Sequence, residues 1–390
     1  MENLIVGGPG AAVADYSGVA VMTDNGQHET IQMINLDVSG FKKGIFLMGY
    51  GGPENAKHGF KDILIEDCVL HHNLEDGGST YADDVGGIID LVIRHSVFDD
   101  TYGEPNNSWT HSGSGFIIGG VEDGLMEHCI AYNNGKDCAA QLEGPVGLWT
   151  YNSTRVTIQF CESYNNESQG SDGGGFDIDG GAQDCVIQYC YSHDNYGYGY
   201  LVVQYNGARA MSGNTIRYNI SENDGNSTEH GGIHLWSAGS SGGIVDTKIY
   251  GNTIYNDRSY GIRFKNTSGQ SGTKLWNNIF ITGSGRPLLY GAPSTEVATF
   301  QGNIWYSING TYDIAGYDSL GAWRAATGQE MLNGSAVGMQ ADPKLTQLGS
   351  GITLNDTTQL ATLTGYQLQP DSPCIEAGLD LQTHFSVAPG

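Results

Sequence analysis

Two aspartates separated by one residue are the sharpest chemical signal in the sequence. Asp177 and Asp179 lie in the run GFDIDG, which starts at Gly175 and has the form of a short β-strand. Because side chains alternate along a strand, both carboxylates are expected to project into solvent from one face, in line with the row on neighbouring segments and with Cα atoms about 6.5–7 Å apart. Glycoside hydrolysis needs two carboxylates near that separation, one as general acid and one as base or nucleophile. Repulsion between like charges would raise the pKa of one and keep it protonated.

Neighbouring Gly-led segments carry groups that suit a carbohydrate at the same strand positions. Aromatic rings stack on sugar faces, and polar side chains bind hydroxyls. His234 is two segments from the aspartate pair, about 10 Å away, so we expect a substrate contact rather than a proton relay. The cations either recognise a carboxylate or sulfate or balance local charge. The predicted substrate-binding residues are Trp149, Tyr151, His234, Trp236, Arg263 and Lys265.

Further acidic residues lie close to this row in the sequence. Asp172 and Glu229 each precede their strand glycine by three residues, and Glu143 lies one position further out. Asp172 or Glu229 could replace one member of the pair, and Glu229 is therefore a third candidate catalytic residue. The alternative is that aspartates on a solvated sheet face bind an ion or nothing at all.

A repeat explains how these segments are positioned. An alternating strand, then Cys or Asn, then a short polar segment recurs about every 25 to 33 residues, which indicates a repeat protein. Examples are DILIEDCVLHHN from Asp62, RVTIQFCESYNN from Arg155 and DCVIQYCYSHDN from Asp184. Each period also holds a Gly-led strand, such as GLWTYN from Gly147 or GIHLWS from Gly232.

Two or three short strands per period, without helical periodicity between them, exclude βαβ units. A β-propeller has a similar period, but the turn signals are wrong for its antiparallel hairpins. The sequence therefore predicts an all-β fold, a single-stranded right-handed parallel β-helix of about nine or ten coils. In such a solenoid the row from Trp149 to Lys265 spans four steps, roughly 19 Å or several sugar units.

Stacking of coils also accounts for the cysteines. Cys68, Cys129, Cys161 and Cys190 fall at the position that Ser96, Asn219, Asn252, Asn278 and Asn303 occupy in other coils. We interpret this column as an internal ladder of small polar side chains, since neither CxxC spacing nor pairing for disulfides is evident. A second column is predicted as a turn ladder beside it and comprises Asn133, Asn165, Asp194, Asn223 and Asn256.

The repeat fades after about Asn309, so residues 1–310 are predicted to form the β-helix. Residues 311–390 are predicted to be a capping segment packed on the solenoid, not an independent domain. SLGAWRAATGQE, from Ser319, predicts a short helix with Ser319 as N-cap that covers the open end of the solenoid. The tail YQLQPDSPCIEAGLD from Tyr366 is predicted to pack back as irregular structure.

Composition and charge narrow the function classes. Gly is 59 of 390 residues, Lys and Arg together are 17, and the net charge is −26. Nucleic-acid binding is disfavoured because it needs clustered Lys and Arg. A polyanionic substrate is less favoured unless a local basic patch overrides the overall field. The sequence shows no signal peptide and no membrane-length apolar run. We expect a secreted monomer with a polysaccharide or oligosaccharide as its partner and no membrane contact.

The run EGPVGLWTYNSTRVTIQFCESYNN and the following SDGGGFDIDGGAQDCVIQYCYSHDNYGYGYLV resemble a known family. They are similar to the secreted bacterial right-handed parallel β-helix repeat proteins of the pectin-lyase-like superfamily. The tail, with YDSLGAWRAATGQE and YQLQPDSPCIEAG, resembles the ending that many members share. The resemblance covers nearly the whole chain and implies the fold. The superfamily includes hydrolases, lyases, epimerases and phage tailspikes, so it leaves the activity open.

Two enzyme groups in the superfamily suggest roles for individual residues. The position of Asp177 and Asp179 resembles that of an Asp-bearing strand motif in the polygalacturonase-type hydrolases. His230-Gly231-Gly232 and Arg263-Phe264-Lys265 are loosely similar to the later His-Gly and Arg-x-Lys elements of those enzymes. The adjacent Asp-Asp pair of those enzymes is missing, because Leu201 to Gln204 holds its place. The calcium-dependent pectate lyases imply instead that Asp172, Asp177 and Asp179 are Ca²⁺ ligands and that Lys265 or Arg263 is the base.

Three hypotheses follow from the sequence. The first is a glycoside hydrolase that cleaves a polysaccharide or oligosaccharide with Asp177 and Asp179 and needs no cofactor. The second is a Ca²⁺-dependent polysaccharide lyase with a basic residue as the base. The third is a non-catalytic adhesin or glycan-binding module that uses the same aromatic face. The first is the preferred prediction.

Overall fold

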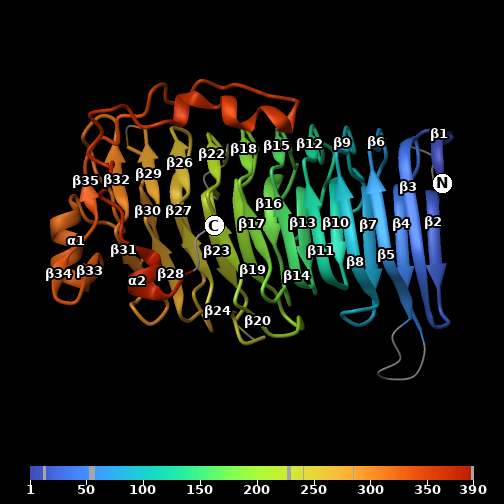
Figure 1. Ribbon diagram of the computed structural model, residues 1–390, viewed down its shortest axis with the longest axis horizontal. Coiled ribbons are helices and arrows are strands. Elements are labelled where there is room, and N and C mark those ends of the chain that lie inside the picture. The colour runs from blue at the N-terminus through green and yellow to red at the C-terminus, as the bar shows by residue number, and fades with distance from the viewer. Residues whose placement is uncertain (12–14, 52–57, 226–229, 240, 284, 388–390) are drawn as a thin grey trace.

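The structure is a computed structural model that describes residues 1–11, 15–51, 58–225, 230–239, 241–283 and 285–387. The chain forms a parallel β-helix of about ten turns, as predicted (Figure 1). Each full coil contributes one strand to each of three parallel sheets, in the same order along the chain. The inward side chains of all three sheets form one continuous apolar core.

Sheet 1 contains the Gly-led strands and carries the predicted site. Each of its strands pairs in parallel with the equivalent strand of the next coil. Its members are β2 (Ser17–Thr23), β4 (Lys43–Gly49), β7 (Asp76–Ala82), β10 (Ser114–Gly119), β13 (Val146–Tyr151), β16 (Gly174–Ile178), β19 (Tyr200–Gln204), β23 (Gly231–Ser237), β27 (Tyr260–Lys265) and β30 (Leu289–Tyr290).

Sheets 2 and 3 follow sheet 1 in every coil, and β3 (Gln27–Ser39) runs through both of them. Sheet 2 continues with β5 (Gly59–Glu66), β8 (Ile88–Arg94), β11 (Val121–Glu127), β14 (Thr154–Gln159), β17 (Val186–Gln188), β21 (Thr215–Arg217), β25 (Lys248–Tyr250), β28 (Thr273–Trp276) and β31 (Ala298–Gln301), with β20 (Met211–Ser212) and β24 (Ile244–Val245) extending it. Sheet 3 contains β1 (Glu2–Gly7), β6 (Val69–His71), β9 (Val97–Asp99), β12 (Ile130–Tyr132), β15 (Glu162–Tyr164), β18 (Tyr191–His193), β22 (Ile220–Glu222), β26 (Thr253–Asn256), β29 (Ile279–Thr282), β32 (Ile304–Ser307) and β35 (Met339–Gln340).

The predicted internal ladder is confirmed at the turn between sheets 2 and 3. The side chains of Asn219, Asn252 and Asn278 are buried, and each Nδ2 donates to the Oδ1 of the next residue in the column, at 2.9–3.0 Å. All seven cysteines are free thiols, and those in this column donate Sγ–H to backbone carbonyls. The ladder therefore satisfies backbone groups that the core would otherwise leave without partners.

The predicted second ladder is displaced by one residue. Asn133 and Asn165 have φ of 56° and 51°, so they form left-handed turns, a conformation that Asn tolerates better than most residues. The hydrogen-bonded ladder is formed by the residues that follow, because these side chains point into the solenoid. It comprises Asn134, Asn166, Asn195 and Asp224.

Glycine begins the strands of sheet 1 because the chain bends there over this second ladder. A Cβ on Gly147 would lie 2.1 Å from Ser163 Oγ, and one on Gly175 would lie 2.3 Å from Ser192 Oγ. Because of this bend, the glycine and the residue that follows it both face inward. The residue before each glycine therefore faces outward, on the same side as the predicted site.

The C-terminal end of the solenoid is closed as predicted by α1 (Leu320–Thr327), whose N-cap Ser319 accepts from Ala322 N–H. Trp323 of α1 is 2% exposed and packs edge-on against Trp305 and Phe300. Glu330 ends the Cys/Asn ladder by accepting from Asn303 Nδ2 at 2.9 Å and Trp305 Nε1 at 3.0 Å. The hairpin β33 (Met331–Leu332) and β34 (Ser335–Ala336) follows.

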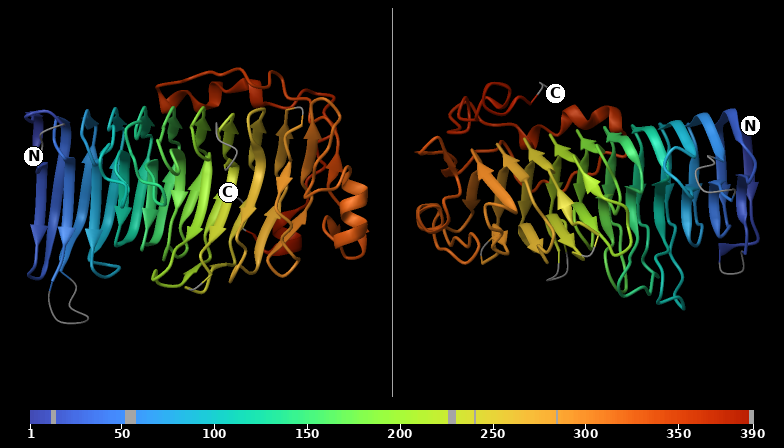
Figure 2. Two further views of the ribbon diagram at one scale, coloured as in Figure 1. Left: turned by 180° about the vertical axis from the view of Figure 1, so that it is seen from behind. Right: turned by 90° about the horizontal axis from the view of Figure 1, so that it is seen from below.

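The remaining residues run back along the solenoid as a strap, which we define as residues 342–368. It lies over sheet 3 from the C-terminal coils to β15 and includes the 3₁₀ helices η2 (Thr357–Thr362) and η3 (Thr364–Tyr366) (Figures 1 and 2). Helix α2 (Leu381–Phe385) packs on sheet 2, where Phe385 stacks on Trp276 with ring centroids 4.3 Å apart. The capping segment is thus packed on the solenoid along much of its length.

Candidate functional site on the outer face of sheet 1

The predicted row of outward residues is aligned in the structure. Trp149 pairs with Asp177, Asp177 with Leu201, Leu201 with His234, and His234 with Arg263. A second row, one side-chain repeat further along each strand, contains Tyr151, Val203, Trp236 and Lys265. The alternate residues Leu148, Phe176, Val202 and Leu235 are buried in the core. The sequence register was therefore right.

The expectation that this row is exposed to solvent was wrong. Asp177 is 2% exposed, Trp149 5% and His234 4%, although none of them faces the solenoid interior. The connections that enter sheet 1 fold back over its face. His111, in the connection before β10, packs edge-on against Trp149 with ring centroids 5.3 Å apart. Loop conformation of this kind cannot be read from strand periodicity, so burial was missed.

The three aspartates all have raised pKa values. Burial, with Asp179 and Asp172 nearby, raises the pKa of Asp177 well above its ordinary value, and its Oδ1 has no hydrogen-bond partner within the described part of the chain. Burial raises the pKa of Asp179 to about 7, even though Gly180 N–H donates to its Oδ1 at 2.5 Å. Burial raises the pKa of Asp172 to about 6, and Gly144 N–H donates to its Oδ2 at 2.8 Å. Protonated carboxylic acids are thus available near neutral pH.

Tyr198 is a site residue that the sequence reasoning missed. It is 1% exposed and lies over Gly174, where an added Cβ would be 2.1 Å from its ring. Burial, with Asp172, Asp177 and Asp179 nearby, raises the pKa of its phenol well above the ordinary value, and the hydroxyl has no hydrogen-bond partner among the described residues. Its ring centroid is 5.6 Å from His230 and 6.3 Å from His234. The missed signal is its position before Gly199, which the strand bend turns outward.

Imidazoles and cations occupy the other side of Tyr198. Burial, together with His230, Arg263 and Lys265, lowers the pKa of His234 well below its ordinary value, so this ring is neutral. Neither ring nitrogen of His234 has a hydrogen-bond partner among the described residues. Arg263 is 6% exposed and its guanidinium lies 5.4 Å from the ring centroid of Tyr290.

The other predicted residues border this cluster. Tyr151 is half-buried and lies 5.5 Å from Trp149 between ring centroids. Trp236 is half-buried and Lys265 is exposed at the rim. Glu143 is exposed and close enough to Asp179 to raise its pKa further. Glu229, the third predicted catalytic residue, lies outside the described residues.

The aspartates do not form a metal centre in this structure. No three or more His, Cys, Asp or Glu side chains of the described ranges are grouped so that they could hold a metal ion. Ca²⁺ binding by Asp172, Asp177 and Asp179 stays a prediction.

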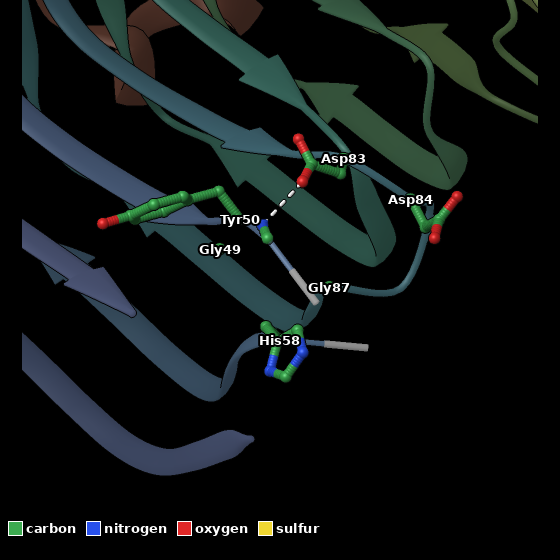
Figure 3. Close-up of a pocket in the computed structure, with 7 residues that line it drawn as sticks. Gly49, Tyr50, His58, Asp83, Asp84 and Gly87 are labelled. Atoms are coloured by element: carbon green, nitrogen blue, oxygen red, sulfur yellow. Dashed lines mark hydrogen bonds between the residues drawn. The ribbon is translucent and has the colours of Figure 1, made fainter. Parts of the chain in front are cut away.

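A small pocket lies elsewhere, at the turn between sheets 1 and 2 near the N-terminus (Figure 3). Asp83 Oδ2 accepts from Gly51 N–H at 2.8 Å, and His58 Nδ1 accepts from Gly26 N–H at 2.6 Å, so both side chains hold turns.

Within the described residues, no helix has the length and apolar character needed to cross a membrane.

Comparison with known proteins identifies the family. Residues 17–247 match the family described as right-handed β-helix region. The chain belongs to this family. Its structure is similar to that of a protein described as pectate lyase Pel9A, at 12% identity and a TM-score of 0.50, with 96% of this chain and 85% of that chain covered. A family 6 polysaccharide lyase from Pseudopedobacter saltans is also matched, at 11% identity and a TM-score of 0.23, with 90% of this β-helix chain and 96% of that chain covered. No curated protein sequence matched the chain.

Proposed function

We propose that this β-helix protein is a polysaccharide lyase that cleaves a uronate-containing polysaccharide on the outer face of sheet 1. The observation that supports it is the cluster in which neutral His234, Tyr198, the cation Arg263 and protonated aspartates gather on one face. The proposal agrees with the pectate lyase whose fold the chain shares. It replaces hydrolysis as the preferred hypothesis, because elimination uses the imidazoles and Arg263 as well as the carboxyl groups.

Elimination requires three groups that this cluster contains. Neutral His234 takes the proton next to the sugar carboxylate, a C=C bond forms, and the glycosidic C–O bond breaks. Arg263, on the strand next to that of His234, holds the sugar carboxylate and stabilises the charge that develops on it. Asp177 lies three strands from Arg263, and its protonated carboxyl donates to a hydroxyl of another sugar unit. Tyr198 donates a proton to the leaving oxygen. Each residue is buried, which strengthens these interactions by excluding water.

The overall charge of −26 opposes a polyanionic substrate. The site itself reduces this effect, because protonation removes charge from the aspartates while Arg263 and Lys265 lie on β27, next to the strand of His234. Secretion is part of the proposal, since a polysaccharide substrate lies outside the cell.

Digestion of a polysaccharide panel tests the proposal. Reducing ends and the ultraviolet absorbance of an unsaturated uronate should appear together with pectate or another uronate polymer. His234→Gln should lower kcat by about 10²–10⁴-fold, the usual contribution of a general base. His384→Gln, at an exposed histidine of α2, is the matched control and should leave kcat unchanged.

Hydrolysis by Asp177 and Asp179 is the second candidate. It is favoured by the different environments of the two carboxyls, since Asp177 has an unpartnered oxygen and Asp179 accepts from Gly180. Reducing ends without ultraviolet absorbance would establish it instead. Glycan binding without either product would indicate the non-catalytic binding module.

Metal removal separates this proposal from a Ca²⁺-dependent reaction. Because the described aspartates are not grouped around a common point, EDTA should leave the initial rate unchanged. Loss of turnover on EDTA treatment and its recovery with Ca²⁺ would contradict this and restore the predicted Ca²⁺ role of Asp172, Asp177 and Asp179.

A further inference from the structure

A cleft of about 600 Å³ opens beside the candidate site, towards the N-terminal coils. Its wall is formed by the connections that lead from sheet 3 into β7, β10 and β13. The residues that matter for its chemistry are Leu74, Tyr102, Glu104, Asn106, Asn107 and Asp137. A volume of this size is in the range of small-molecule binding sites.

The cleft offers hydrogen-bonding groups that are balanced in charge. Asn106 is exposed, while Asp137 and Tyr102 are half-buried. Glu104 is paired with Lys42 at 3.6 Å, and Lys136 Nζ lies 3.5 Å from the ring centroid of Tyr102. Amides, carboxylates and an aromatic ring suit the hydroxyls and apolar face of a sugar. A phosphate or nucleic-acid ligand would require unpaired cations instead.

One loop connects this cleft to the candidate site. Glu104 lines the cleft, and its backbone N–H donates to Ser112 Oγ at 2.8 Å. His111 of the same loop packs on Trp149, and Ser114 Oγ accepts from Trp149 Nε1 at 3.2 Å. The same loop therefore lines the cleft and covers Trp149, the N-terminal member of the row that contains Asp177. From β16 to β7 is three strand spacings, about 14 Å, the length of a few sugar units.

We infer that the cleft is a distal subsite that binds a further sugar ring of the same polysaccharide through its hydroxyls. The inference rests on the proposed function for the identity of the ligand. A long oligosaccharide reaches both the Asp177 row and the cleft, whereas a dimer occupies only the former. The cleft thus determines chain-length preference without taking part in the chemistry.

The test measures binding without turnover. In the His234→Gln chain, affinities for dimer-to-octamer series of pectate, alginate and xylan are measured by calorimetry. We expect at least one series to bind about tenfold more tightly at the longest lengths than as dimer. Asn106→Ala with Asp137→Ala should remove this gain and leave the dimer affinity unchanged. Asn309→Ala, at an exposed turn, is the control and should keep the gain.

Two results would overturn the inference: affinity that does not depend on length, or a length dependence that the double variant retains. Absence of binding in all three series would overturn it as well. Failure of the proposed lyase reaction is a separate outcome, because it is read from product formation by the unmodified chain. If the unmodified chain makes no unsaturated product while binding still depends on length and the double variant loses this dependence, that result supports the subsite alone.

Discussion

At the scale of single residues, the carboxyl group of Asp177 combines burial, an unpartnered oxygen and two neighbouring aspartates. Its pKa is higher in the folded chain than in the unfolded chain, so the folded state holds the proton more tightly. Stability should therefore be greatest at acidic pH and fall as pH rises above the ordinary aspartate pKa.

Asp177→Asn should remove this pH dependence, because an amide does not ionise. Its melting temperature should match that of the unmodified chain near pH 4 and exceed it near pH 8. The gain should grow as pH rises, because only the unmodified chain has a buried carboxyl group that ionises. Thermal unfolding across this pH range measures it, and Asp90→Asn, at an exposed aspartate of sheet 2, is the control. A variant that is less stable than the unmodified chain at pH 8 would show that Asp177 is ionised and stabilising.

At the same scale, sequence alone predicted which residues share the outer face of sheet 1. Alternation along Trp149, Asp177 and His234 fixed their direction, because a one-residue slip would place the apolar partners in solvent. Alternation could not predict that other side chains cover these residues. His111 and Tyr198, which cover them, come from connections whose conformation follows no periodic sequence pattern. Tyr198 faces outward only because the strand bends at Gly199.

At the scale of elements, the Cys/Asn ladder ties the coils together through buried side chains. Asn252→Ala removes four hydrogen bonds, to Asn219 N–H, Asn219 Nδ2, Ile216 O and Asn278 Oδ1. The expected loss in free energy of unfolding is about 4 kcal/mol, at roughly 1 kcal/mol for each bond. Denaturant unfolding measures it. A loss as small as that of the exposed control Asn309→Ala would show that water replaces the ladder.

Glu330 makes the closed end of this ladder sensitive to pH. Burial raises its pKa to about 7, so the folded state favours the protonated form. Stability from this group is full below its unfolded pKa of about 4.5 and declines as pH rises to 7. Glu330→Gln keeps the acceptor for Asn303 and Trp305 and should flatten this decline in a pH series of unfolding curves. An unchanged slope would assign the decline to other carboxyl groups.

The ladder and the end-capping helix were predictable because they depend on periodic or local sequence signals. Ser319 and the polar column at Asn219 and Asn252 each have such a signal. The strap had none, because its attachment depends on single contacts between residues that are far apart in sequence. Glu222, for example, accepts from Gly351 N–H, which lies 129 residues later in the chain.

At the scale of the whole molecule, the strap binds two buried carboxylates of sheet 3. Glu162 accepts from Leu354 and Asn355 N–H, both at 2.8 Å, and Glu222 accepts from Gly351 N–H at 2.6 Å. Glu162→Ala should release the strap locally, because two backbone donors lose their acceptor. Limited proteolysis should then cut within residues 350–358 faster than in the unmodified chain. Equal rates in Glu162→Ala and in the exposed control Glu29→Ala would show that apolar contacts alone hold the strap.

His193 lies beneath the strap and gives a second pH effect, which is caused by hydrogen bonds rather than by burial. Burial disfavours its charged form, but hydrogen bonds to Asp194 and Glu162 outweigh this and raise its pKa to about 9. This stabilisation is full below the unfolded pKa of about 6.5 and is lost as pH rises through 9. His193→Gln should therefore destabilise the chain at pH 6 and have a smaller effect at pH 10, as measured by denaturant unfolding.

The strap also bears on how the protein is made. Solenoid coils ordinarily assemble one upon another as they emerge from the ribosome, each needing only its predecessor. Here the amide donors that bind Glu162 belong to residues that are synthesised almost two hundred positions later. The central coils can stack during translation, but the contacts of Glu162 with the strap form only after Leu354 and Asn355 have been synthesised.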